Sequence, residues 1–152
     1  MAITARVQRH VAGDYDDSEG TIHSRNKEAT APAIVRGAVL SANGGTQVRI
    51  CVAADKGPIY ICKTAKPLNQ TYVDCIYGEH VIFYVISDGI IPANGLGECG
   101  ATGKIKASAG TNPVVAQYVK HGTKSNDPVT PLASSADGDV IGIKIIKDGA
   151  ES

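Results

Sequence analysis

The sequence predicts an all-β protein: a small, compact β-barrel or sandwich preceded by an extended N-terminal arm. Three observations predict this class. The 152-residue chain contains 17 glycines and 7 prolines, which supply many turns. Short apolar runs rich in valine and isoleucine recur between those turns. Aromatic residues make up 5% of the chain and tryptophan is absent, so the core should be mainly aliphatic.

The first 32 residues differ from the rest of the chain. Ile3, Ala5 and Val7 alternate with polar neighbours, as in a strand that lacks a partner. An acidic run at 14–20 and a polar run at 23–28 follow, and together they hold too few apolar residues to build a core. We therefore expect an extended arm at 1–32 and a β domain at 33–152. An ordinary flexible terminus is the alternative for the first part.

From residue 33 onward, strand signals recur at short spacing and are separated by turns such as Asp55-Lys56-Gly57 and Asp137-Gly138-Asp139. The expected strands are near 33–40, 46–53, 58–63, 72–77, 80–87, 103–108, 114–121 and 140–147. Alternate positions within them predict a core made of Val35, Val39, Val48, Ile50, Ile59, Ile61, Val81, Phe83, Val85, Ile105, Ile141 and Ile143.

Two segments need a decision between alternatives. Residues 112–122 begin with Asn-Pro and end with Lys-His-Gly, as a helix often does. The β-branched residues between these ends and the surrounding β context favour a strand. Both structures remain open for this segment.

Residues 95–100 match G-x-G-x-x-G, the dinucleotide-binding pattern. The period-two sequence that follows them predicts no helix, so we expect a glycine-rich bend and no bound nucleotide.

Charge and residue types exclude several function classes. Fifteen basic and fifteen acidic residues give a formal net charge of zero, so nucleic acid is not an expected partner. No apolar run reaches the roughly 18 residues of a membrane span, and no export signal is visible, so a protein that stays in the cytoplasm where it is made, without membrane association, is expected. The four histidines are scattered and no nucleophile elbow occurs. We expect no enzyme activity, no metal and no cofactor.

Four cysteines, at 51, 62, 75 and 99, are separated by 11, 13 and 24 residues. These spacings contain no C-x-x-C pair of the kind that binds zinc. Cys51 and Cys62 lie in strand-like apolar runs, where a free cysteine behaves as a small hydrophobe. Buried, reduced thiols are therefore expected, with a disulfide as the alternative.

The order of turns and strands resembles the small capsid decoration proteins (head-stabilising or cement proteins) of tailed bacterial and archaeal viruses. The resemblance lies in segments 54–59, 90–95, 101–107 and 137–143 and in the hydrophobic strand that ends at 88–89, within a region of about 33–147. It implies a compact, non-catalytic β domain that sits on the capsid surface, usually as a trimer, and a terminal arm that often makes the grip.

The expected function is therefore that of a structural virion protein. It would bind the major capsid protein on the outer surface of the shell as a homotrimer and stabilise the capsid. The arm residues expected to make this contact are Ile3, Ala5, Arg6, Val7 and Arg9. The alternatives are an adaptor module of a tail or fibre, and a small β-barrel that binds a ligand or carbohydrate.

Overall fold

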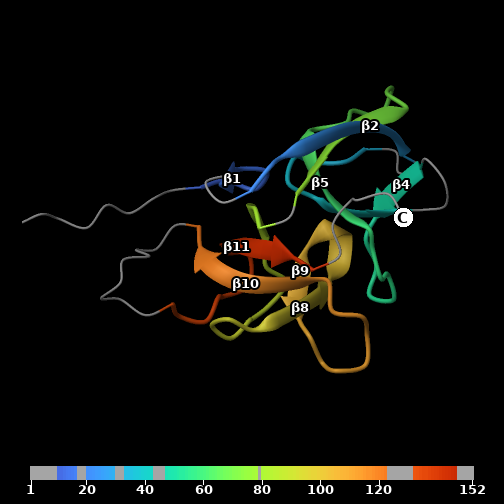
Figure 1. The fold of residues 1–152 in the computed structure, drawn as a ribbon. Helices are drawn as coiled ribbons and strands as arrows, with labels where there is room; N and C mark the ends of the chain where they lie inside the picture. The colour runs from blue at the N-terminus through green and yellow to red at the C-terminus, as the bar shows by residue number, and fades with distance from the viewer. Residues whose placement is uncertain are drawn as a thin grey trace, which may run out of the picture.

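The computed structural model describes residues 10–16, 20–29, 33–42, 47–78, 80–122 and 132–146. They form a closed five-stranded barrel and a six-stranded sheet, packed against each other (Figure 1). Within these ranges the one helical element is a single 3-10 turn, Ala101–Gly103. The predicted all-β class with a barrel is confirmed. The described residues contain no helix long and apolar enough to cross a membrane.

The barrel occupies the first half of the chain. Its strands run in the order β2-β4-β3-β5-β6. Their bounds are β2 (His23–Ala29), β3 (Val39–Ala42), β4 (Gln47–Ile50), β5 (Ile59–Thr64) and β6 (Tyr72–Tyr77). Six antiparallel pairs between β2 and β6 and a short parallel contact between β2 and β4 close it. Closure leaves the barrel without a free edge.

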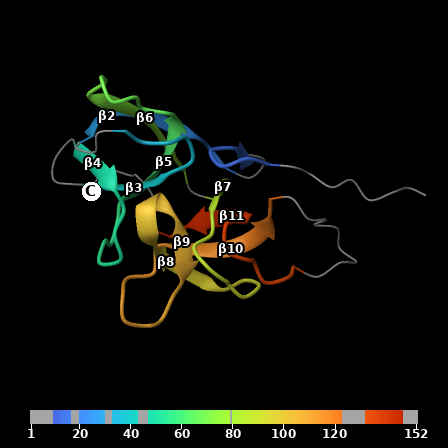
Figure 2. The ribbon, with the colours of Figure 1, turned by 180° about the vertical axis from the view of Figure 1, so that it is seen from behind.

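The six-stranded sheet contains most of the second half of the chain (Figure 2). Its order is β1-β7-β11-β10-β8-β9 and every pairing is antiparallel. The bounds are β1 (Tyr15–Asp16), β7 (Ile82–Ile86), β8 (Leu96–Cys99), β9 (Ile105–Ala107), β10 (Ala116–His121) and β11 (Val140–Ile145). Residues 116–121 are thus a strand, as the β-branched composition favoured.

The two layers share one apolar cluster, and a second cluster fills the barrel. On β5, Ile59 and Ile61 belong to the shared cluster, while Tyr60 and Cys62 belong to the barrel interior. Because both faces of β5 are buried, this strand is a continuous apolar run rather than an alternating one.

Most of the predicted core residues are buried, with two exceptions. Ile50 is only partly buried against the barrel interior, and Val35 is 71% exposed. Strand β3 begins at Val39 rather than near residue 33, because the chain first turns at Gly37, which has a φ of +86°. Val35 therefore lies in a turn, where it has no inward-facing position.

Three strands lie where the sequence predicted none. Residues 15–16, placed in the arm, form β1 of the six-stranded sheet. Residues 23–29, placed in the arm, form β2 of the barrel; the inward position Lys27 is buried, with its ammonium 5.1 Å from the centroid of the Tyr60 ring. Residues 96–99, placed in a glycine-rich bend, form β8, where Gly97 pairs with Ala107. A Cβ at Gly97 would lie 2.6 Å from Ile105, so close packing requires the glycine.

Candidate binding surfaces

The residues expected to contact a capsid, Ile3, Ala5, Arg6, Val7 and Arg9, lie outside the described residues, as do the other residues before His10. The segment that follows them, 10–16, is fixed to the six-stranded sheet. The His10 N–H donates to the Gly122 carbonyl at 2.8 Å, and the Gly13 N–H donates to the Tyr84 carbonyl at 2.8 Å. This segment ends in β1, which pairs with β7.

Side chains strengthen this attachment. The His10 ring stacks on the Tyr84 ring, with centroids 3.8 Å apart and planes 10° apart. Phe83 and Val85 point into the cluster shared with the barrel, so Tyr84, between them, lies on the other face of β7. The segment 10–16 therefore covers part of the sheet face that is turned away from the barrel.

The same segment is also joined to the barrel. Arg36, in the turn before β3, donates to the Ala12 carbonyl at 2.9 Å and to the Asp14 carboxylate at 3.1 Å. Partial burial would raise the pKa of Asp14, but hydrogen bonds from the Val11 N–H and from Arg36 outweigh it and hold this pKa below its ordinary value. At Gly37, an added Cβ would collide with the Ala12 side chain, so the two segments meet closely.

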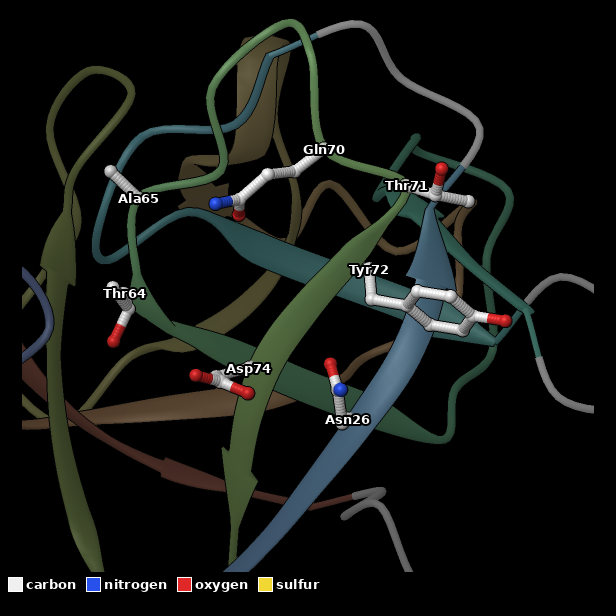
Figure 3. Close-up of a pocket in the computed structure, with 7 residues that line it drawn as sticks. All are labelled: Asn26, Thr64, Ala65, Gln70, Thr71, Tyr72 and Asp74. Carbon is white, nitrogen blue, oxygen red and sulfur yellow. The ribbon is translucent and has the colours of Figure 1, made fainter.

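A polar pocket of about 370 Å³ lies on the outer face of the barrel (Figure 3). Its lining residues come from β2, the end of β5, the loop after β5 and β6: Asn26, Thr64, Ala65, Gln70, Thr71, Tyr72 and Asp74. Strand register explains part of this grouping. Asn26 pairs with Asp74 and Asp74 with Thr64, so these three side chains form one row across β2, β6 and β5.

The polar side chains of this pocket are available to a ligand. All seven lining residues are exposed. Within the described part of the chain, none of the six polar lining side chains makes a hydrogen bond or ion pair with the protein. Sequence reasoning missed the pocket because its members are brought together by strand pairing across nearly fifty positions, and no local motif marks them.

Other polar groups are paired and stabilise the fold. The buried Glu98 carboxylate on β8 lies 3.3 Å from the Lys106 ammonium and accepts from the Asn112 amide at 3.2 Å. The Nε2 of buried His121 lies 3.0 Å from an Asp139 carboxylate oxygen. Among the residues whose positions the structure gives, no group of three or more His, Cys, Asp or Glu could hold a metal ion.

All four cysteines are buried and have free thiols. They form two neighbouring pairs: Cys62 and Cys75 are direct partners across β5 and β6, while the Cys51 thiol interacts with Cys99. Burial raises the pKa of Cys62 to about 11 and that of Cys75 to about 12. These thiols are therefore protonated at neutral pH and poor nucleophiles.

The fold is similar to that of a solved phage protein. No family model matches the chain, and no curated protein matches it. Among solved structures, the N base of the head fiber gp8.5 of bacteriophage phi29 aligns with a TM-score of 0.58 over 87% of this chain and 100% of that chain. The two chains share a fold. Their sequences are 11% identical, so the likeness concerns the arrangement of strands.

Proposed function

We propose that this chain is a non-enzymatic structural protein of a virion, which binds the outer surface of the capsid as a trimer and stabilises it. The observation that carries the proposal is the shared fold with the base of a phage head fiber, because the alignment includes the whole of that base. The order of turns and strands along the sequence supports the same class independently.

The contact with the shell is proposed to involve residues 1–9, which are the part of the predicted arm that is hereafter called the arm. Ile3, Ala5 and Val7 could add a strand to an exposed sheet edge of the major capsid protein, where backbone hydrogen bonds give affinity. Arg6 and Arg9 would then meet acidic groups of the shell. The attachment of His10 to Gly122 and Tyr84 supports this role, because force on the arm would be transmitted to the sheet.

A trimer strengthens such a contact without a strong individual site. Ordering an extended arm costs roughly 1–2 kcal/mol per residue, so one short arm binds weakly. Three arms on one trimer bind with avidity, because the second and third bind at a high effective concentration.

The test is cosedimentation of the purified full-length chain with heads of its own virus that lack it, together with light scattering to measure its mass in solution. We expect a trimer that saturates the heads and raises their thermal stability. A full-length chain that binds isolated tails and leaves heads bare would favour the adaptor alternative. A protein that binds neither particle would overturn the proposal.

A further inference from the structure

We infer that the polar pocket on the outer face of the barrel is a binding site for neutral carbohydrate. This inference does not depend on the virion role, because it rests on the lining residues of the pocket. It identifies the chemistry of a site that lies outside the proposed capsid contact at residues 3–9.

The pocket carries a mixed set of hydrogen-bonding groups. Two amides, Asn26 and Gln70, provide donors and acceptors, and two hydroxyls, Thr64 and Thr71, provide both functions on one atom. The Asp74 carboxylate accepts only, and it can receive two neighbouring hydroxyl groups of one ligand. A ring of alternating hydroxyls matches this mixed set better than a ligand with one kind of polar group.

An aromatic ring lies at the side of the pocket. Tyr72 is 55% exposed although it belongs to a strand of the closed barrel. In Figure 3 its ring extends over β2 beside Asn26. A sugar ring has an apolar C–H face as well as polar edges, and an exposed aromatic ring can pack against that face while amides bind the edges.

The charge of the pocket lining favours an uncharged ligand. Asp74 is the one ionisable carboxylate among the lining residues, and lysine, arginine and histidine are absent from them. Phosphates and sugar acids would meet a like charge without a compensating cation. A divalent cation would find a single negatively charged ligand, and the affinity of an oxygen site for such a cation falls when it has few charged ligands. Uncharged hydroxyl-rich ligands meet neither obstacle.

The volume of the pocket and the backbone around it fit a small ligand. A volume of about 370 Å³ lies at the lower end of the roughly 300–1,000 Å³ typical of small-molecule sites. The backbone around the pocket is held by the β2–β6 ladder, and the Ala29 N–H donates to the Thr71 carbonyl at 2.9 Å. The binding groups therefore stand on a framework that exists before the ligand arrives.

The experiment uses the full-length protein on an array of neutral and acidic glycans, followed by NMR titration with the neutral sugar that binds best and with a galacturonic acid oligomer. We expect millimolar or tighter binding of a neutral sugar, with chemical-shift changes at the lining residues 26, 64–65, 70–72 and 74. The galacturonic acid oligomer should leave those signals unchanged. An array without a bound neutral glycan, or shifts confined to other residues, would overturn the inference.

Two variants and one control sharpen the test. Tyr72→Ala should weaken sugar binding about tenfold, because stacking on the ring is lost. Asp74→Asn should weaken binding of the neutral sugar and admit the galacturonic acid oligomer, because the repelling charge is removed. Tyr15→Ala removes another exposed tyrosine, on β1, and should leave sugar binding unchanged. Equal loss in all three variants would contradict the assigned pocket.

The two proposals can fail separately. In the full-length chain, replacing Arg6 and Arg9 together by alanine leaves every lining residue of the pocket in place, so this variant should bind sugar as the unchanged chain does. Weaker head binding in that variant with sugar binding intact would support both proposals. Loss of sugar binding in that variant would contradict the pocket assignment.

Discussion

The side chain of Arg36 donates to the Asp14 carboxylate at 3.1 Å and thereby joins the barrel to the segment that leads into β1. Both side chains are partly exposed, so the pair should contribute less than about 1 kcal/mol to the free energy of unfolding. Its main effect should be local.

Replacing this arginine tests that expectation. Arg36→Ala should speed amide hydrogen exchange at residues 11–14, because the contacts of Arg36 with Ala12 and Asp14 are lost, while exchange in β5 stays slow. Lys56→Ala, which removes an exposed cation elsewhere, is the matched control. Unchanged exchange at 11–14 in Arg36→Ala would show that hydrogen bonds to Tyr84 and Gly122 hold the segment without the arginine.

Asp55 predicts a loss of stability in acid. Burial would raise its pKa, but hydrogen bonds from Ser41, the Val52 N–H and Arg49 outweigh this and hold the pKa below its ordinary value of 3.8. Since the folded pKa is the lower one, the stabilisation is complete above about pH 3.8 and is lost as pH falls through the folded pKa.

Asp55→Asn should therefore lower the free energy of unfolding by about 1.5–3 kcal/mol at pH 7, and the difference from the wild-type chain should shrink in acid. Urea titrations at several pH values measure this difference. Asp74→Asn, at an exposed carboxylate, should have little effect at any pH. A difference for Asp55→Asn that is constant with pH would show that its carboxylate charge is not what stabilises the turn.

The strands that sequence patterns predicted well are those with apolar side chains inside. Residues 72–77 form β6 with the predicted bounds, and Phe83 and Val85 point into the core. Strand β2 gave no such signal, because one of its inward positions carries Lys27 and four of its seven residues are exposed. Its place is decided by closure of the barrel with β6, which is a tertiary contact.

The candidate sites show the same difference between local sequence patterns and tertiary contacts. Glu98 was part of a motif considered for nucleotides, and the structure instead pairs it with Lys106 across the β8–β9 hairpin. The pocket could not be predicted from spacing, since Asn26 and Asp74 become neighbours only when β2 pairs with β6. Turn chemistry and alternation are local properties, whereas strand order across a barrel is not.

The core shared by the two layers predicts a large cost for truncation at β11. Ile143 is fully buried there, so Ile143→Ala should lower the free energy of unfolding by about 2–5 kcal/mol. Ile90→Ala, at a side chain that is 69% exposed, should change it by less than about 0.5 kcal/mol. Equal effects in urea denaturation would mean that the face of β11 is assigned incorrectly.

The cysteines should be unreactive in the folded protein. Burial and raised pKa values keep Cys62 and Cys75 protonated, so a disulfide reagent at pH 7 should label the native chain slowly. The same reagent should label all four thiols once the chain is denatured. Replacing the four by alanine should lower stability through lost packing and leave assembly intact. Rapid labelling of the native chain would contradict this expectation. So would an intact molecular mass that is two units lower for each cysteine pair, because each disulfide removes two hydrogens.

The N-terminal arm predicts which deletion separates folding from capsid binding. From the sequence, removal of residues 1–30 should leave a folded β domain. That deletion would remove β2, one of the five strands that close the barrel, so it should unfold the barrel instead.

A chain that begins at residue 10 keeps every described strand and the stacking of His10 on Tyr84. We expect it to remain folded and trimeric, with circular dichroism and mass in solution like those of the full-length chain, and to lose binding to heads.

Replacing Arg6 and Arg9 together by alanine in the full-length chain should weaken head binding less than the deletion does, because Ile3, Ala5 and Val7 still contribute backbone pairing and apolar contact. The loss of affinity in this double variant should be larger at low salt than at high salt, because salt screens the charge that the arginines contribute. If the chain that begins at residue 10 decorates heads as tightly as the full-length chain, the contact lies on the described surface and the arm is a passive tail.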